Sequence, residues 1–270
     1  MNHENILVCP KCKKALDTIG KSLVCENRHT YDISKSGYVN LNLKPVDSGD
    51  SVEMVRSRSR FLDSGYYFKF ADAITSVISD NPHNIIVDAG CGEGYYSEII
   101  SRKFPKSDIY GFDLSKSAVQ KSAKRAKELT AFFAVCSIFD LPLRTASADV
   151  VINLFAPCAA EEFARILKPG GILIMGVAGE DHLFGLKSAI YENVYLNTPE
   201  KVSAPEGFAE KSRHRVKYTA HICGTDTVKD LFAMTPYYWK TSKSDADKLN
   251  NITELDTLLD FDIVVFERTR

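Results

Sequence analysis

The sequence contains no long hydrophobic run. Its longest apolar stretch, residues 172–178, includes Gly176 and is far shorter than the roughly 20 residues that a membrane-spanning helix needs. The N-terminal segment MNHENILVCP also lacks the basic region and apolar core of a signal peptide. Together these absences predict a cytoplasmic protein with no membrane partner.

The sequence also lacks an excess of charge of either sign. Its 34 Lys and Arg residues face 35 Asp and Glu residues, which gives a formal net charge of -1. The whole chain is therefore not a polycation that coats nucleic acid, and any such contact must come from local patches. A hydrophobic content of 44% over 270 residues excludes a disordered or fibrous chain and suits one large α/β domain, or a smaller one with an appendage.

Cysteine is sparse, but three of the seven cysteines lie close together near the N-terminus. Cys9 and Cys12 form a CPKC motif, which Cys25 and His29 follow. Three sulfurs and one imidazole complete the tetrahedral shell of a structural zinc ion. The alternative, a redox pair, needs a surrounding βαβ pattern, and none precedes Cys9. Because the first 43 residues hold too few apolar side chains for a core of their own, we expect a zinc ribbon with one hairpin between the ligand pairs.

The other four cysteines lie in apolar or glycine-rich contexts. We interpret Cys91, Cys136, Cys158 and Cys223 as small core residues.

Basic residues gather in three places along the chain. They occur throughout the first 44 residues, at Arg56, Arg58 and Arg60, and between Lys211 and Lys217. Such clusters either contact the phosphates of a nucleic acid or form ordinary solvated surface. Acidic residues near the C-terminus balance them, so the neutral overall charge does not exclude an RNA substrate.

The most informative segment, residues 85–96, reads IIVDAGCGEGYY. An apolar strand leads into a turn with alternating glycines, and a helix is expected to follow. Gly90 and Gly92 let the backbone approach a ligand closely. A dinucleotide-binding loop would have its last glycine one residue later, where Tyr95 stands. The observed spacing, preceded by Asp88, is typical of S-adenosylmethionine (SAM) sites, where the loop wraps the amino-acid end of the ligand.

A second strand, residues 108–113, ends in Asp113. A carboxylate at the end of this strand can accept hydrogen bonds from both ribose hydroxyls. The alternative is that Asp113 caps the helix that begins near Lys116, but the glycine loop before it favours ribose binding. Residues 136–142 follow a third strand, and their backbone and apolar side chains would flank an adenine ring.

Further strands and helices alternate after this segment. We expect strands at residues 132–135, 149–154 and 172–177, an edge pair at 216–222 and 261–266, and helices at 161–167, 182–195 and 227–234. This order predicts an α/β fold with a Rossmann-like, doubly wound, seven-stranded sheet, a small N-terminal zinc ribbon, and a ligand at the carboxyl ends of the strands.

Several segments resemble class I SAM-dependent methyltransferases: VDAGCGEGYY, FDLSKSAV, the Leu-Pro after Asp140, and ARILKPGG. More narrowly, the chain resembles the bacterial 23S rRNA (guanine-N1)-methyltransferases. The segments that carry this resemblance are CPKC, HTYDISKSGYVNL, GDSVEM, RFLDSGYY, FAPC, HLFGLKSAIYENVYLNTP and MTPYYW. They extend from Cys9 to about Trp239, and the last three are not general methyltransferase signals.

The resemblance implies an enzyme that uses SAM to methylate N1 of a guanine in a 23S rRNA hairpin loop near the peptide exit tunnel. Family members act as homodimers whose zinc domains help to form an RNA-binding groove. Two neighbouring loop positions are used within the family, one of them linked to macrolide resistance. The chain then divides into a zinc-ribbon RNA-binding domain at 1–45, a linker and cap helices at 46–80, and a SAM-dependent methyltransferase domain at 81–270.

The resemblance also assigns roles to single residues. Cys9, Cys12, Cys25 and His29 match the zinc ligands, and Tyr67, Gly92, Glu93 and His182 match the SAM contacts. Ser137 stands where many class I enzymes place an aspartate beside the adenine amino group. The segment NLFAP lacks the Asn-Pro-Pro-aromatic motif of enzymes that methylate exocyclic amines, which fits a ring nitrogen as the acceptor.

Methylation of guanine N1 requires the loss of its proton, which a nearby base would assist. Asp140 and Glu93 are candidates for this base, and Asn153 is a candidate hydrogen-bond partner, but the sequence does not identify the base. Two other functions stay open: a SAM-dependent enzyme acting on a small molecule or protein with a structural zinc ribbon, and a non-catalytic RNA-binding assembly factor.

Overall fold

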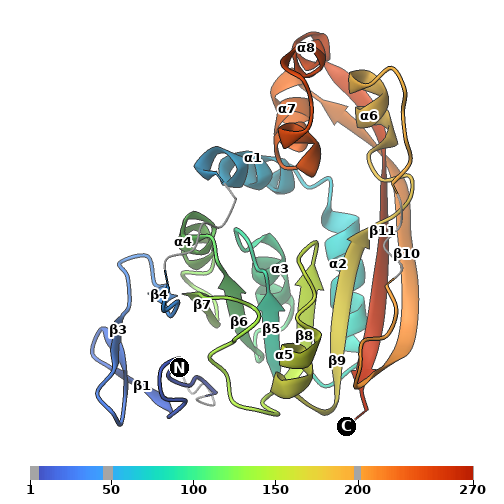
Figure 1. Cartoon of the computed structure of the whole chain (residues 1–270). Coiled ribbons are helices and arrows are strands. Elements are labelled where there is room, and N and C mark those ends of the chain that lie inside the picture. The colour runs from blue at the N-terminus through green and yellow to red at the C-terminus, as the bar shows by residue number, and fades with distance from the viewer. Residues whose placement is uncertain (1–5, 45–50, 198–201, 270) are drawn as a thin grey trace.

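The computed structural model describes residues 6–44, 51–197 and 202–269. The predicted linker at residues 45–50 lies outside these ranges. Within them, an eight-stranded sheet forms the centre of the fold, and a three-stranded sheet belongs to the N-terminal ribbon (Figure 1). In the same ranges, no helix combines the length and the apolar character needed to cross a membrane.

The central sheet contains the seven predicted strands and one more. In spatial order, its strands are β10 (Phe208–Cys223), β11 (Glu254–Arg268), β9 (Leu167–Ala178), β8 (Ala148–Leu154), β5 (Ile85–Ala89), β6 (Asp108–Asp113), β7 (Ala131–Val135) and β4 (Val39–Asn40). The strands from β9 to β4 are parallel, whereas β11 is antiparallel to both β9 and β10. The chain winds outward from β5 in one direction and from β8 in the other, so the two meet at the point where such sheets bind ligands.

Helices cover both faces of this sheet, whose central strands are apolar and buried on either side. The helices α2 (Phe68–Ser79), α3 (Tyr95–Lys103), α6 (Phe184–Ile190) and α7 (Thr225–Ala233) share one core cluster with the sheet. On the same face, α4 (Lys116–Arg125) packs on β6 and β7 beside α3. On the other face, α5 (Ala160–Ile166) and the ribbon share a second cluster.

Two serines begin helices that later position the site. The Ser51 hydroxyl accepts a hydrogen bond from the Met54 N–H (3.1 Å) at the start of α1 (Val52–Asp63). The Ser115 hydroxyl accepts one from the Ala118 N–H (3.4 Å) at the start of α4. Each satisfies a backbone donor that the first helical turn leaves without a partner.

The C-terminal part extends the sheet into a long arm. The antiparallel pair of β10 and β11 continues beyond the other strands. Its far end carries α6, α7 and α8 (Lys243–Asp247), while α1 lies between these helices and α4 (Figure 1). Two short 3-10 helices, η1 (Pro236–Trp239) and η2 (Lys248–Asn251), complete this region. The arm therefore faces the carboxyl edge of the sheet across α1.

The ribbon is built from a hairpin of β1 (Leu16–Ile19) and β2 (Ser22–Cys25), as predicted, with β3 (Thr30–Asp32) beside it. It is attached to the sheet by backbone hydrogen bonds. The Val8 N–H donates to the Pro142 carbonyl (2.8 Å), and the Leu41 N–H donates to the Val135 carbonyl (2.9 Å). The ribbon also adds β4 as an eighth strand beside β7, so ribbon and sheet stabilise each other.

Two expectations about local structure were wrong. The predicted helix over 182–195 is limited to α6, because Leu183 adopts a left-handed conformation before it and Tyr191 is extended after it. Cys158 and Cys223 are exposed rather than core residues, because one lies in the loop after β8 and the other ends the edge strand β10. Cys91 and Cys136 are buried, as expected.

Candidate functional site

The glycine loop after β5 requires glycine at each of its three glycine positions. Gly90, Gly92 and Gly94 all have positive φ angles, of 90°, 52° and 85°, which other residues adopt only with strain. A Cβ atom on Gly90 would lie 2.8 Å from the Ala156 Cβ, and one on Gly94 would lie 2.8 Å from the Ser122 Cα. The loop is therefore a bare backbone cradle between β8 and α4.

The carboxylates of Asp88 and Glu93 are held by protein groups. The Ser97 hydroxyl donates to Asp88 (2.5 Å), and burial raises the pKa of Asp88 to about 7. The Arg125 guanidinium binds Glu93, which is only 2% exposed, with its Nε 2.8 Å from Oε2. Burial raises the pKa of Glu93, although Arg125 opposes this effect. The Glu93 carboxylate is thus held in an ion pair with Arg125.

Asp113 links the glycine loop to the end of β6. Its carboxylate accepts hydrogen bonds from the Gly92 N–H (3.0 Å) and the Ser115 N–H (2.8 Å). Because Ser115 itself caps α4, Asp113 is not the helix cap. At the end of β7, the half-buried Ser137 accepts a hydrogen bond from the Phe139 N–H (3.2 Å). Both residues lie at the carboxyl edge of neighbouring strands, as the sequence predicted.

Tyr67 and His182 are separated by more than one hundred residues but touch each other. The Tyr67 hydroxyl lies 3.2 Å from the His182 Nε2, and both side chains are buried against Phe261. Burial is the main reason that the pKa of His182 falls to about 4, and burial also raises the pKa of Tyr67. Both groups are therefore uncharged near neutral pH.

At the end of β8, one buried polar atom lacks a partner in the described part of the chain. Asn153 donates to the carbonyls of Ala89 (3.0 Å) and Pro157 (3.2 Å), but its Oδ1 accepts no hydrogen bond. Phe155, two residues later, has a positive φ of 54° and is 48% exposed. Asn153 Oδ1 is thus a buried acceptor without a donor beside the glycine loop. Such an atom fits a bound group with N–H donors, which SAM and guanine both carry.

Asp140 does not lie free at this edge. It is exposed and forms an ion pair with Lys13 of the ribbon (2.7 Å). The candidate base at this position is thus a contact between the ribbon and the sheet. Both carboxylates proposed from the sequence are therefore ion-paired, Asp140 at the surface and Glu93 in the interior.

The four predicted zinc ligands converge. The ligand atoms of Cys9, Cys12, Cys25 and His29 all lie within 4.8 Å of one another. The Cys12 and Cys25 sulfurs are 3.7 Å apart, and the His29 Nδ1 lies 3.4 Å from the Cys9 sulfur. Two sulfurs that each bind one tetrahedral zinc at about 2.3 Å would be roughly 3.8 Å apart, so the donor set fits this metal.

Groups around Cys9 favour its thiolate form, whereas burial raises the pKa of Cys25. Burial opposes ionisation of Cys9, but hydrogen bonds from the Tyr31 hydroxyl and from the N–H groups of Cys12 and Lys11 lower its pKa to about 6. Zinc binds the thiolate form of cysteine.

The basic cluster on β10 is largely neutralised by acidic side chains. Arg215 binds the buried Asp260 (2.7 Å), Arg213 binds Glu210 (2.9 Å), and Lys217 binds Asp181. Of the two interpretations of this cluster, the structure favours solvated surface with internal ion pairs over an open phosphate-binding patch.

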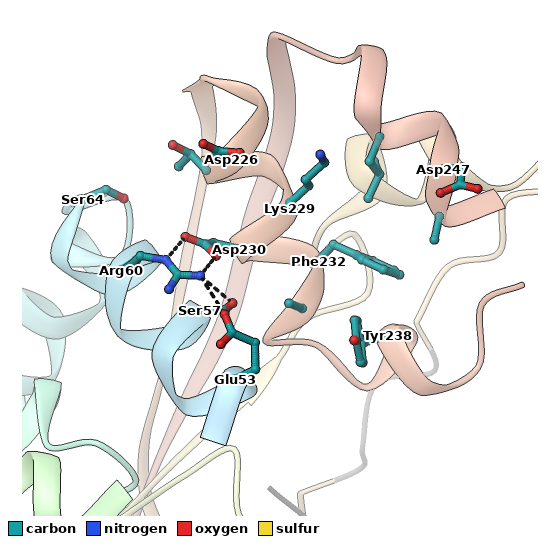
Figure 2. A pocket seen from close by; sticks show the side chains of 14 residues that line it. Glu53, Ser57, Arg60, Ser64, Asp226, Lys229, Asp230, Phe232, Tyr238 and Asp247 are labelled. Carbon is teal, nitrogen blue, oxygen red and sulfur yellow. Dashed lines mark hydrogen bonds and ion pairs between the residues drawn. The ribbon is translucent and has the colours of Figure 1, made fainter. Parts of the chain in front are cut away.

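A groove of about 700 Å³ lies between α1 and the C-terminal helices (Figure 2). Arg60 binds Asp230 (2.6 Å) on its wall, and Glu53, Lys229 and Tyr238 also line it. This groove contains none of the glycine-loop residues, so it is distinct from the candidate cofactor site.

Sequence reasoning missed Arg125. From α4 it contacts Glu93 of the glycine loop, Glu98 of α3, and Ser59 and Asp63 of α1. Its position in a run of lysines and arginines carried no signal that set it apart from surface residues.

Comparisons with known proteins agree with this geometry. A methyltransferase domain family matches residues 80–233, and a family described as "RlmA, N-terminal" matches residues 7–51. A Bacillus subtilis protein provisionally named 23S rRNA (guanine-N1)-methyltransferase YxjB is 33% identical over 95% of each chain. The 23S rRNA (guanine(748)-N(1))-methyltransferase of Streptomyces fradiae is 34% identical over 68% of this chain and 67% of that protein.

Among solved structures, YcgJ of Bacillus subtilis has a TM-score of 0.48 at 14% identity, over 74% of this chain and 98% of that one. The methyltransferase domain implies SAM as cofactor, and the ribbon with its cysteine and histidine cluster implies zinc. The chain belongs to the 23S rRNA (guanine-N1)-methyltransferases.

Proposed function

We propose that this chain transfers the methyl group of SAM to N1 of a guanine in a 23S rRNA hairpin loop near the peptide exit tunnel. The names of its relatives support the RNA and the atom. The observation that carries the proposal is the open edge between β5 and β8. There the glycine cradle, the unfilled Asn153 Oδ1 and the exposed Phe155 lie together.

The proposed cofactor site uses the residues around this edge. Gly90 and Gly92, whose positive φ angles shape the loop, present their backbone to the amino-acid end of SAM, and Glu93 contributes only its backbone, since its carboxylate is bound by Arg125. Asp113 binds the ribose and Ser137 lies beside the adenine. Tyr67 and His182 close the site from the side of β11, and Asp88 supports the loop from behind through Ser97.

SAM supplies a methyl group that its sulfonium already activates, so the protein mainly has to align the acceptor. The exposed ring of Phe155 offers a stacking surface for a base that has left its loop. Asn153 Oδ1 accepts a hydrogen bond from the guanine and orients it. Asp140 and Glu93 are both ion-paired, and we propose that the N1 proton leaves to solvent.

In this proposal the zinc ribbon at residues 1–45 binds the RNA, and the helices within 46–80 cover the cofactor. Residues 81–270 catalyse the methyl transfer. The enzyme acts as a cytoplasmic homodimer whose ribbons help to form an RNA-binding groove. A 23S rRNA substrate supports the cytoplasmic location, and the exposed lysines of the ribbon support its RNA contact.

The test is incubation of the zinc-loaded protein with tritiated SAM and a 23S rRNA hairpin transcript, followed by mass mapping of the nucleotide. We expect one methyl group on N1 of a single guanine. Label on small molecules or protein but not on RNA would favour a different methyl acceptor. Tight RNA binding without any transfer would indicate a non-catalytic assembly factor. The mapped position also decides whether macrolide resistance is a relevant phenotype.

A further inference from the structure

The side chain of Asn197 forms four hydrogen bonds at the junction of three segments. Its Nδ2 donates to the carbonyls of Gly179 (2.9 Å) and His182 (3.0 Å). Its Oδ1 accepts from the Lys187 ammonium (2.7 Å) and from the Tyr237 hydroxyl (2.9 Å). Two acceptors on one side and two donors on the other fix the orientation of the amide. Asn197 therefore joins the turn before α6 to α6 itself and to η1.

The turn between β9 and α6 carries His182, whose Nε2 lies 3.2 Å from the Tyr67 hydroxyl in the proposed cofactor site. Within this turn the His182 N–H donates to the Gly179 carbonyl (3.2 Å). Asn197 binds the carbonyls of the same two residues, and it does so from the segment that follows α6. Because the backbone of a residue sets where its side chain can reach, the Asn197 amide helps to fix the position of the His182 ring.

The acceptor side of Asn197 meets a buried ammonium group. Lys187 is only 1% exposed, and burial lowers its pKa. Within the described residues Lys187 forms no ion pair, and its Nζ donates to Asn197 Oδ1 and to the Tyr195 carbonyl (3.0 Å). The Nζ also lies 4.8 Å from the ring centre of Tyr195 and 5.3 Å from that of Tyr237. A buried cation needs such partners, so these contacts hold Asn197 firmly in place.

Asparagine suits this junction because its side chain both donates and accepts hydrogen bonds. An aspartate of the same shape would still accept from Lys187 and Tyr237. It would, however, direct a carboxylate oxygen at the carbonyls of Gly179 and His182, which have no proton to donate. The substitution of asparagine by aspartate therefore breaks the contact with the turn and keeps the contact with α6 and η1.

We propose that Asn197 holds the backbone of His182 in the position from which the His182 ring contacts SAM. This inference rests on the proposed methyl transfer from SAM, including the placement of His182 beside the cofactor. Asn197 is then a positioning residue, which acts through His182 without touching the cofactor. Through Lys187 and Tyr237 it also connects this part of the cofactor site to α6 and η1 at the far end of the arm.

The experiment measures SAM binding and the environment of His182 in the full-length, zinc-loaded protein. We expect Asn197→Asp to bind SAM about 3- to 10-fold more weakly in calorimetry, which is the effect of losing one neutral hydrogen bond. The NMR signals of the His182 ring, recorded without SAM, should also shift in this variant. Their absence from the spectrum of His182→Asn identifies these signals.

Asn193→Asp is the matched control, since Asn193 is exposed in the same segment. Its SAM affinity and its His182 signals should equal those of the unmodified protein. Asn197→Ala introduces no charge and should weaken SAM binding as well, so it answers the question if Asn197→Asp does not fold. An unchanged dissociation constant, or unchanged His182 signals, in the folded variant would overturn the role of Asn197 alone. Failure of the unmodified protein to bind SAM would overturn the proposed function and this inference together.

Discussion

The backbone N–H of Asp260 lies 3.2 Å from Nδ1 of His182 and donates a hydrogen bond to it. Nδ1 must therefore be unprotonated, so the proton of the neutral ring is on Nε2 and points to the Tyr67 hydroxyl (3.2 Å). The Lys187 ammonium also lies near this ring and adds to the fall in the pKa of His182 that burial causes. The residue that the family resemblance assigns to SAM is thus a neutral donor with a defined tautomer.

The first prediction concerns the pH dependence of stability. Between pH 4 and 6.5 the unfolded chain protonates His182 while the folded chain does not. The unfolded state then binds more protons at this group, so the contribution of His182 to stability falls as the pH drops through this range, by roughly 3 kcal/mol in total. Asp88 acts in the opposite direction, because its pKa rises from 3.8 to about 7 on burial. The contribution of Asp88 to the free energy of unfolding is therefore present at low pH and is lost as the pH rises toward 7.

Two variants separate these opposing effects in urea unfolding measured between pH 4 and 7. His182→Asn keeps an acceptor for the Asp260 N–H, and its stability relative to the unmodified protein should improve as the pH falls. Asp88→Asn should show the reverse trend, with its relative stability improving as the pH rises. A pH-independent difference for both variants would contradict the assigned protonation states.

A second prediction concerns the zinc ribbon. Cys25→Ser removes one ligand, and we expect the bound zinc to fall from one equivalent to a small fraction. Because β4 pairs with β7, the loss should extend beyond the ribbon and accelerate exchange of the Leu41 amide, which donates to Val135. Metal analysis and hydrogen exchange measure the two effects. Cys158→Ser, an exposed cysteine outside the cluster, is the control. A full equivalent of zinc in Cys25→Ser would rule out this ligand set.

The elements that the sequence predicted well depend on local patterns. The zinc ligands, the glycine loop and the apolar strands are each encoded within a few tens of residues, so spacing and periodicity identify them. The parts that the sequence could not show depend on pairings over long distances. Arg125 with Ser59, Asp140 with Lys13, and β4 with β7 join segments about 65 to 125 residues apart, and no local pattern in the chain indicates any of them.

Glycine positions give a third prediction with an internal control. Gly94 and Gly170 both have positive φ angles, of 85° and 75°. A Cβ on Gly94 would lie 2.8 Å from the Ser122 Cα, whereas one on Gly170 would meet nothing within 4 Å. Gly170→Ala should therefore cost only the backbone strain, about 1 kcal/mol. Gly94→Ala should cost about 1–3 kcal/mol more, because α4 must move. Denaturant unfolding measures both, and equal losses would show that the contact between the loop and α4 adjusts freely.

The fourth prediction compares two buried tyrosine hydroxyls. The Tyr67 hydroxyl is the acceptor for the Nε2 proton of His182. In the described part of the chain, the buried Tyr96 hydroxyl has no hydrogen-bond partner. Tyr67→Phe leaves the His182 donor unsatisfied, which should lower the free energy of unfolding by about 1–3 kcal/mol and weaken SAM binding. Tyr96→Phe removes a hydroxyl that is already unsatisfied, so its stability should stay equal or rise. The two substitutions delete the same atom from two tyrosines of one core cluster. A similar loss in both would mean that the hydroxyl of Tyr67 contributes packing alone and that His182 finds another acceptor.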